Sequence, residues 1–442
     1  MLDRDALLKA AAELLQRQPP LLDSRELNAF VQSFLERRDR FLRACGEHGS
    51  PLYVIDEQVL LDRARQFRSA FLRELPDVRV YYAVKSNNHP AIARALVGAG
   101  LGLDTSSGRE LELALKCGSD DILLSGPGKT QDELSMAVLN RDRVTVLMDS
   151  FGELARLEQV AAQGGAHIRA GVRLTTDERG LWRKFGIPLS DLPEFLEVSQ
   201  QCNHVLLRGL QFHTSWNLEP GSQVRFIGRL GAALRELKPE LRSLIEFVDI
   251  GGGFWPPQGE WLQAAGTPAG PLLQVALPAS KTSLQHYRLP SSPLTEFARQ
   301  IGQAVRAELF PSICCRICTE PGRWLCNDVM HILLTVVDRK ADDLVITDGG
   351  TNAIGWERFE SDYFPVINLS RPSLTEHACY VMGSLCTPHD LWGYGYCGEG
   401  IEEGDILLVP TQGAYTYSLR QDFIKPLPKA VVVPNIEEAP SF

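Results

Sequence analysis

Short apolar runs alternate with amphipathic segments through most of the chain after residue 51. The runs are rich in Val, Ile, Leu and Tyr, as buried strands are, whereas segments such as 89–100 and 109–118 have helical spacing. Alternation of this kind predicts parallel strands joined by crossover helices. The eight predicted strands are residues 80–84, 101–105, 121–125, 144–149, 168–174, 205–213, 246–251 and 315–320.

Eight such units are typical of a (β/α)8 TIM barrel, although the pattern alone leaves a doubly wound sheet open. After residue 320 the helical periodicity fades, and strand-like runs separated by turn signals predict a C-terminal, mainly-β domain. We expect residues 49–322 to form the barrel and residues 323–442 the β domain. The strand at 50–56 could instead join the β domain.

Two further segments depart from this alternation. Residues 1–48 are predicted to form a helical N-terminal extension, in which Asp23 and Glu26 have capping-box spacing before an apolar helical face. Its predicted role is packing or a dimer contact. The second segment, residues 257–292, is an insert rich in Pro, Ala, Gly and Ser, and the sequence leaves open whether it is a lid or disordered.

Composition excludes several classes of function. The net charge of −10 provides no basic excess for binding a nucleic-acid backbone. The first 20 residues lack the features of a signal peptide, and no apolar run reaches the roughly 18 residues needed to span a membrane, so we expect a cytoplasmic protein. The Cys315–Cys318 spacing lacks a second pair and is predicted to be part of a strand, so we expect no metal site.

Ionisable residues and glycines lie at the predicted strand ends. The carboxyl ends of the strands of such a barrel meet at one mouth, where active sites are found. Each residue alone is commonly a cap, a turn or a core residue, and it is their joint placement that predicts a site. They are Lys85, Asp104, His213, Gly251, Gly252, Gly253, Glu320, Gly322 and Arg323.

These residues together suit the binding of one kind of cofactor. A glycine-rich loop after the seventh strand offers backbone N–H groups to a phosphate. The amine of Lys85 in a partly desolvated mouth can form a Schiff base with an aldehyde. The carboxylate of Glu320 can hold a protonated pyridine nitrogen. Together these groups match the needs of pyridoxal 5'-phosphate.

Ten motifs, in one order across residues 50–425, also resemble a known family. They include YYAVKSN (81–87), GLQFHTSW (209–216), VDIGGGF (248–254), TEPGR (319–323) and GSLCTPHD (383–390). The chain resembles the fold type III pyridoxal-phosphate decarboxylases, which include the diaminopimelate, ornithine and biosynthetic arginine decarboxylases. The resemblance implies an alanine racemase-like barrel with a C-terminal β domain.

The resemblance also implies roles for matching residues. Lys85 would carry the cofactor as a Schiff base with Asp104 beside it, His213 would stack on the cofactor ring, and Glu320 would pair with the pyridine nitrogen. Gly251, Gly252 and Gly253 would bind the phosphate, with Arg323 and Tyr415 near it, and Gly322 would also contact the cofactor. Family members are homodimers with shared active sites, so a homodimer is implied.

Further implied roles concern the substrate. Cys386, from the second subunit, would act near the proton-transfer site, with Asp390 as its companion. The resemblance implies that Glu320 and Cys386 together favour decarboxylation over racemisation. A racemase or epimerase of the same fold, and a non-catalytic relative that binds a partner protein, remain as alternatives.

Two departures from the family pattern bear on the substrate. Thr387 follows the cysteine, where diaminopimelate and ornithine enzymes have an acid that meets the distal amine of the substrate. A hydroxyl cannot offer that charge-assisted bond. Trp216 stands where the family has a serine, and it would narrow the substrate pocket. The sequence therefore predicts a decarboxylase of an atypical amino acid.

Overall fold

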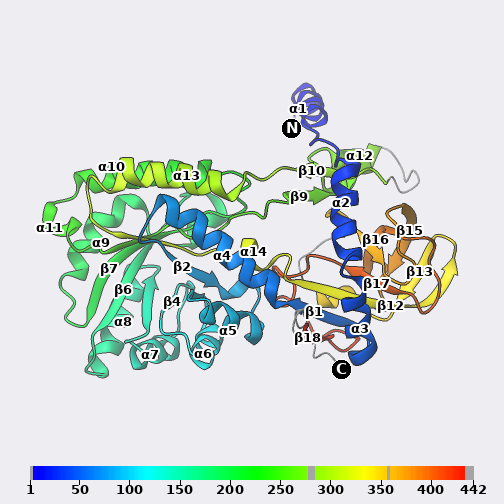
Figure 1. The fold of residues 1–442 in the computed structure, drawn as a ribbon. Helices are drawn as coiled ribbons and strands as arrows, with labels where there is room; N and C mark the ends of the chain where they lie inside the picture. Colours follow the sequence, from blue (N-terminus) through cyan, green and yellow to red (C-terminus); the bar gives the residue numbers. More distant parts are fainter. Residues whose placement is uncertain (1–2, 277–283, 356–358, 434–442) are drawn as a thin grey trace. The chain divides into compact units, whose positions relative to one another are not determined.

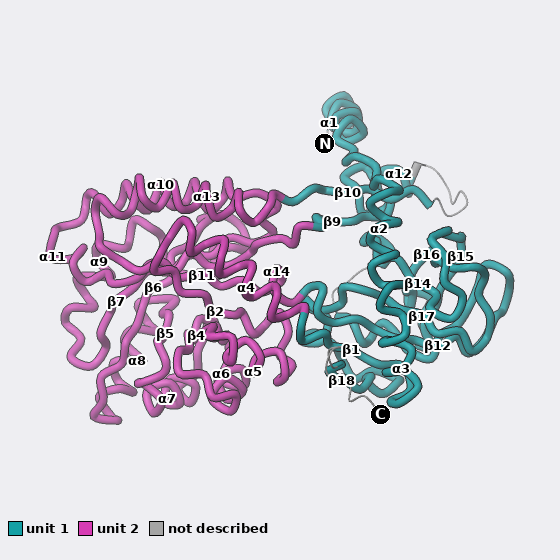
Figure 2. The backbone as a smooth tube through the Cα atoms, in the orientation of Figure 1, with its two compact units in different colours: residues 1–58, 258–291, 327–442 teal, residues 59–257, 292–326 magenta. Residues whose placement is uncertain are grey.

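The chain folds into two compact units in a computed structural model that describes residues 3–276, 284–355 and 359–433. We name the first the barrel unit, which consists of residues 59–257 and 292–326, and the second the β unit, which consists of residues 1–58, 258–291 and 327–442. Figure 2 shows the barrel unit in magenta and the β unit in teal.

The barrel unit contains a closed parallel barrel in the strand order β11-β2-β3-β4-β5-β6-β7-β8 (Figure 1). All eight strands predicted from the sequence are present, and closure of the sheet excludes the doubly wound alternative. The strands are β2 (Arg79–Ala83), β3 (Gly102–Thr105), β4 (Ile122–Leu124), β5 (Val144–Met148), β6 (Ile168–Leu174), β7 (Val205–Phe212), β8 (Phe247–Asp249) and β11 (Arg316–Thr319).

Helices follow the strands and bury one face each. Their starts carry the signals that the sequence contains: Thr130 and Glu133 form a complete capping box, and Ser107 and Ser150 cap the helices that follow them. The helices are α4 (Glu57–Glu74), α5 (Pro90–Gly98), α6 (Gly108–Lys116), α7 (Gln131–Leu139), α8 (Phe151–Gln163), α9 (Leu192–Ser199), α10 (Gly221–Glu236), α11 (Pro239–Arg242), α13 (Leu294–Ala304) and α14 (Arg323–Cys326).

Side chains fill the interior of the barrel at its amino end. Tyr81, Leu123, Leu147, Phe247 and Cys318 form one buried cluster. A Cβ atom at Gly209 would collide with the Phe247 ring, so glycine is needed there for the ring to pack. In barrels of this kind the active site lies at the carboxyl ends of the strands.

The β unit is built on an eight-stranded sheet in the order β13-β15-β16-β14-β17-β12-β1-β18. Strand β1 pairs antiparallel with β12 and parallel with β18, so the strand at 50–56 joins the β sheet, as the sequence allowed. The strands are β1 (Leu52–Asp56), β12 (Met330–Ala341), β13 (Leu344–Thr347), β14 (Val366–Asn368), β15 (Glu376–Met382), β16 (Leu391–Cys397), β17 (Ile406–Val409) and β18 (Lys429–Val433).

The N-terminal helices are part of this unit. Val31, Phe34 and Phe41 lie in one buried cluster with residues of the sheet. The predicted capping box does not form, because Asp23 caps the backbone of Arg25 while the Glu26 side chain bonds Arg288 at 2.8 Å. The helices are α1 (Arg4–Gln16), α2 (Ser24–Leu35), α3 (Arg38–His48) and, in the insert, α12 (Gly270–Ala276).

The insert also belongs to the β unit, which differs from the contiguous ranges expected from the sequence. Its strands β9 (Glu260–Leu262) and β10 (Tyr287–Leu289) form a small antiparallel sheet. The buried His286 bonds Glu376 of β15 at 3.0 Å, which ties the end of the insert to the large sheet. The question of a lid or disorder concerns the whole insert, residues 257–292, of which residues 277–283 lie outside the described residues.

No helix in the described part of the chain has the length and apolar character that crossing a membrane requires.

Candidate active site

Lys85 lies where the first barrel strand ends. Strand β2 stops at Ala83 and a single 3₁₀ turn (Val84–Ser86) follows, which brings the Lys85 Nζ atom to 3.1 Å from the Asp104 carboxylate at the end of β3. Asp104 is fully buried and also accepts a hydrogen bond from the Ser125 hydroxyl, while the Lys85 side chain is about one-third exposed. Burial, and then the charge of Glu320, raise the pKa of Asp104.

Glu320 follows the last barrel strand and is buried in the same mouth. The amide of Gln211, on β7, donates to it at 3.3 Å, and the His213 Nδ1 atom lies 3.6 Å away. Burial opposes the ionisation of Glu320, but the positive charge of Lys85 favours it, and the pKa of Glu320 is lowered. Burial lowers the pKa of His213, whose Nδ1 atom accepts the Gly252 N–H at 3.1 Å, so this ring is neutral.

The three glycines after β8 form a tight loop against these residues. Gly251 and Gly253 have φ values of 68° and 82°, in the region that favours glycine. A Cβ atom at Gly252 would collide with the Glu320 carbonyl oxygen, and one at Gly253 with the Thr214 carbonyl oxygen. The loop thus presents backbone rather than side chains, as an anion-binding loop must.

Gly322 and Arg323 follow Glu320 in the same loop. Gly322 leaves no room for a Cβ atom, which would collide with the hydroxyl of Ser86, the neighbour of Lys85. The Arg323 guanidinium lies 4.6 Å from the centre of the Trp255 ring, just beyond the glycine loop. Cation–π stacking of this kind fixes the direction of the arginine.

Trp216 lines the same pocket as His213. It is 65% exposed and has a φ value of 51°, which is unusual for a bulky residue and marks local strain. Together with His213 and Trp182 it lines a cavity of about 510 Å³. The narrowing of the substrate pocket by Trp216 stays a prediction.

The remaining predicted residues are in the β unit. Cys386 is exposed on the loop between β15 and β16. Asp390 is buried, and its carboxylate accepts bonds from the Thr351 N–H at 2.7 Å and the Leu385 N–H at 2.6 Å, so it fixes the shape of the Cys386 loop. Tyr415 lies elsewhere in this unit with a φ value of 62°.

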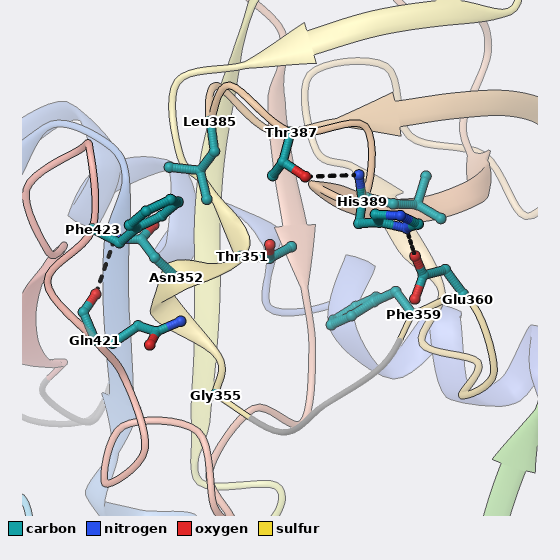
Figure 3. Close-up of a pocket in the computed structure, with 11 residues that line it drawn as sticks. Thr351, Asn352, Gly355, Phe359, Glu360, Leu385, Thr387, His389, Gln421 and Phe423 are labelled. Carbon is teal, nitrogen blue, oxygen red and sulfur yellow. Dashed lines mark hydrogen bonds and ion pairs between the residues drawn. The ribbon is translucent and has the colours of Figure 1, made fainter.

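Thr387 lines a pocket of about 220 Å³ within the β unit (Figure 3). Its hydroxyl accepts the His389 backbone N–H at 3.4 Å, and the His389 ring bonds Glu360 at 2.8 Å. Glu360 is the sole carboxylate among the described residues that line the pocket, and it already has this histidine partner.

Sequence reasoning missed three polar residues that support the mouth of the barrel. Gln211 bonds Glu320, Ser125 bonds Asp104, and Asp249 is buried at the end of β8 beside Glu320. A signal was present for Gln211 and Asp249, since each is a polar residue within an apolar strand. Whether such a residue points into the barrel depends on the register of its strand, which cannot be inferred from the sequence alone.

Comparison with known proteins identifies the family. Residues 61–327 match the family model described as "Pyridoxal-dependent decarboxylase, pyridoxal binding domain". The chain is 27% identical over 401 residues to the diaminopimelate decarboxylase of Methanothermobacter thermautotrophicus, covering 88% of this chain and 87% of that protein. It is 25% identical over 393 residues to the L-glutamyl-(BtrI acyl-carrier protein) decarboxylase of Niallia circulans, covering 84% and 85%.

Solved structures agree on the fold. The diaminopimelate decarboxylase from M. jannaschi superposes with a TM-score of 0.73 at 22% identity, covering 88% of each chain. The residues at the mouth fit the expected cofactor, because an amine faces buried carboxylates beside a loop that excludes side chains. The chain belongs to the family of pyridoxal-dependent decarboxylases, and pyridoxal phosphate is its cofactor.

Proposed function

We propose that the protein decarboxylates an amino acid other than diaminopimelate or ornithine, with Lys85 as the cofactor anchor. The observation that carries the anchor assignment is the Lys85 amine, 3.1 Å from the buried Asp104 and in the same mouth as Glu320 and the glycine loop. When bound, the cofactor supplies an electron sink for the carbanion left by departing CO2.

The residues of the mouth have separate tasks in this proposal. Lys85 would hold the aldehyde end of the cofactor, and Asp104 would keep the lysine in place. Ionised Glu320 would favour a protonated pyridine nitrogen, which deepens the electron sink. Neutral His213 presents a ring face without adding a competing charge. The backbone of Gly251–Gly253, with Arg323, binds the phosphate.

Protonation of the product is assigned to the β unit. We propose that Cys386 of a second copy delivers the proton to the Cα atom, as the resemblance implies, so the active enzyme is a homodimer. The exposure of Cys386 is consistent with this task. Asp390 acts through the shape of the loop, since one of its oxygens accepts the Leu385 N–H of this loop and the other accepts the Thr351 N–H outside it.

The substrate differs from those of the diaminopimelate enzymes at its far end. A carboxylate is the ordinary partner of a distal ammonium group, and the pocket at Thr387 offers a hydroxyl and a Glu360 that is already paired with His389. Relatives with different substrates also exist, since one acts on a glutamyl group attached to a carrier protein. We therefore propose a substrate whose distal end is not an ammonium group.

The first test concerns the cofactor and the reaction. Purified protein should bind pyridoxal phosphate with a visible absorbance band and should release CO2 from one member of an amino-acid panel. Lys85→Ala should lose both, whereas Lys116→Ala, an exposed lysine of α6, should keep both. Racemisation of a substrate without release of CO2 would support the racemase alternative, and a protein that binds no cofactor would support the non-catalytic one.

The second test concerns the far end of the substrate. Thr387→Glu should raise kcat/KM for amino acids with a distal ammonium, because it supplies the missing charge-assisted bond. Serine at this position keeps the hydroxyl and serves as the control. High activity of the unchanged protein on diaminopimelate or ornithine would contradict the substrate proposal while leaving the decarboxylase assignment intact.

A further inference from the structure

Asp249 is a buried carboxyl group that the proposed mechanism does not use. It ends β8, is fully buried, and lies in register with Gln211 of β7 and Cys318 of β11. The titratable groups that face it are Glu320, Asp104, Cys318 and Tyr81. None of the residues in this group is positively charged, so an ionised Asp249 would have no counter-ion among them.

The two oxygens of Asp249 have different surroundings. Oδ1 accepts the Gly251 N–H at 2.8 Å, which fixes the orientation of the carboxyl group. Oδ2 is buried and receives no hydrogen bond from any described residue. Glu320 lies beside this carboxyl group, because its backbone N–H donates to the Gly251 carbonyl at 2.8 Å and its carboxylate contacts Gln211, which is in register with Asp249. Two ionised carboxylates in such a contact repel each other, and one proton turns the contact into a hydrogen bond.

Glu320 in turn lacks a strong donor. The Gln211 amide reaches its two oxygens only at 3.3 and 3.5 Å. The His213 Nδ1 atom accepts the Gly252 N–H, so a neutral His213 cannot also donate from that atom to Glu320. Burial and the charge of Glu320 raise the pKa of Asp249 well above its usual range, which agrees with a proton on Oδ2.

We propose that Asp249 is a positioning residue whose carboxylic acid donates a hydrogen bond from Oδ2 to Glu320. The bond holds the Glu320 carboxylate ionised and aimed at the pyridine nitrogen of the cofactor. This inference rests on the proposed role of Glu320. It predicts that a neutral donor can replace the acid: in Asp249→Asn the amide oxygen accepts the Gly251 N–H and the amide nitrogen takes the place of Oδ2.

Infrared spectroscopy of the full-length chain at neutral pH tests the proton directly, with or without cofactor. The wild-type protein should show the carbonyl band of a buried carboxylic acid, and Asp249→Asn should lose it. Asp142→Asn, the same replacement at an exposed residue, should leave the band unchanged. A wild-type spectrum without the band, or a band whose intensity is unchanged in Asp249→Asn, would overturn the inference and leave the proposed function untouched.

The effect on Glu320 is tested with the cofactor bound. Asp249→Asn should keep kcat within about threefold of wild type, whereas Asp249→Leu, which has no donor, should lose about tenfold to a hundredfold, the range expected for one charge-assisted bond. The nitrogen NMR shift of labelled cofactor should report a protonated pyridine in Asp249→Asn and reduced protonation in Asp249→Leu. Equal losses in both variants would refute the donor role, and failure of the wild type to bind cofactor would instead refute the proposed function.

Discussion

A buried ion pair beside the mouth of the barrel allows a quantitative prediction. The Lys129 Nζ atom lies 2.6 Å from Glu153 of α8, and the two side chains are 2% and 1% exposed. Lys129 also donates to the Leu147 carbonyl at the end of β5, at 2.7 Å. The pair therefore ties the loop after β4 to the next strand and helix of the barrel.

Removing one partner should be costly, because it leaves the other charge buried without compensation. For Lys129→Met we expect the free energy of unfolding to fall by about 3–5 kcal/mol at pH 7. Burial raises the pKa of Glu153 even with its partner present. Without Lys129 the deficit should shrink as the pH falls, since Glu153 then takes up a proton and becomes neutral.

Urea unfolding at fixed pH, followed by circular dichroism and tryptophan fluorescence, measures this difference. The double variant Lys129→Met with Glu153→Leu should recover most of the loss, since an apolar pair of similar volume needs no compensation. Lys116→Met breaks the exposed pair with Glu112 and should cost at most about 0.5 kcal/mol. A loss below about 1 kcal/mol in Lys129→Met, or no recovery in the double variant, would refute the reasoning.

Three further predictions follow from the same structure. Gly252→Ala should abolish cofactor absorbance in a titration with pyridoxal phosphate, because the new methyl would collide with the Glu320 carbonyl. Asp249 has a raised pKa, so stability should fall as the pH rises toward that value, and Asp249→Asn should lessen the fall in urea midpoint between about pH 5 and pH 8. Asp390→Ala should lower the free energy of unfolding by about 3 kcal/mol in urea and slow turnover, while cofactor absorbance remains.

Each of these has an outcome that would contradict it. Normal cofactor absorbance in Gly252→Ala would mean that the loop can shift away from Glu320. An unchanged pH dependence in Asp249→Asn would mean that Asp249 folds in its ionised form. Loss of cofactor absorbance in Asp390→Ala would place that residue closer to the cofactor than the β15–β16 loop suggests.

The barrel could be predicted from the sequence because its signals are local. Each strand is a short apolar run followed by a helix with its own cap, as with Thr130 before α7. The β unit was predicted less completely, since β14 has three residues and β16 contains Gly393 and Gly395 within an aromatic run. The pairing of β1 with β12 joins segments almost 280 residues apart, and such pairing leaves no trace in local periodicity.

The same distinction applies to the candidate site. Lys85, Asp104, His213 and Glu320 could be brought together from the sequence because parallel strands end at one edge of a barrel. The environment of each carboxyl group could not be predicted in this way. It depends on which residues the register of the barrel strands places next to that group.

Asp104 and Asp249 illustrate how the register of the barrel strands affects the ionisation of a buried acid. Both are acids at the ends of barrel strands, both are fully buried, and both have raised pKa values, first through burial and then through the charge of Glu320. Asp104 faces the Lys85 amine at 3.1 Å, an ion pair that favours its charged form. Asp249 faces Gln211, Cys318 and Glu320, none of which compensates a negative charge. Burial therefore favours the protonated form of Asp249. The charge of Lys85 therefore distinguishes Asp104 and Glu320, whose charged forms it favours, from Asp249, for which we propose a neutral donor.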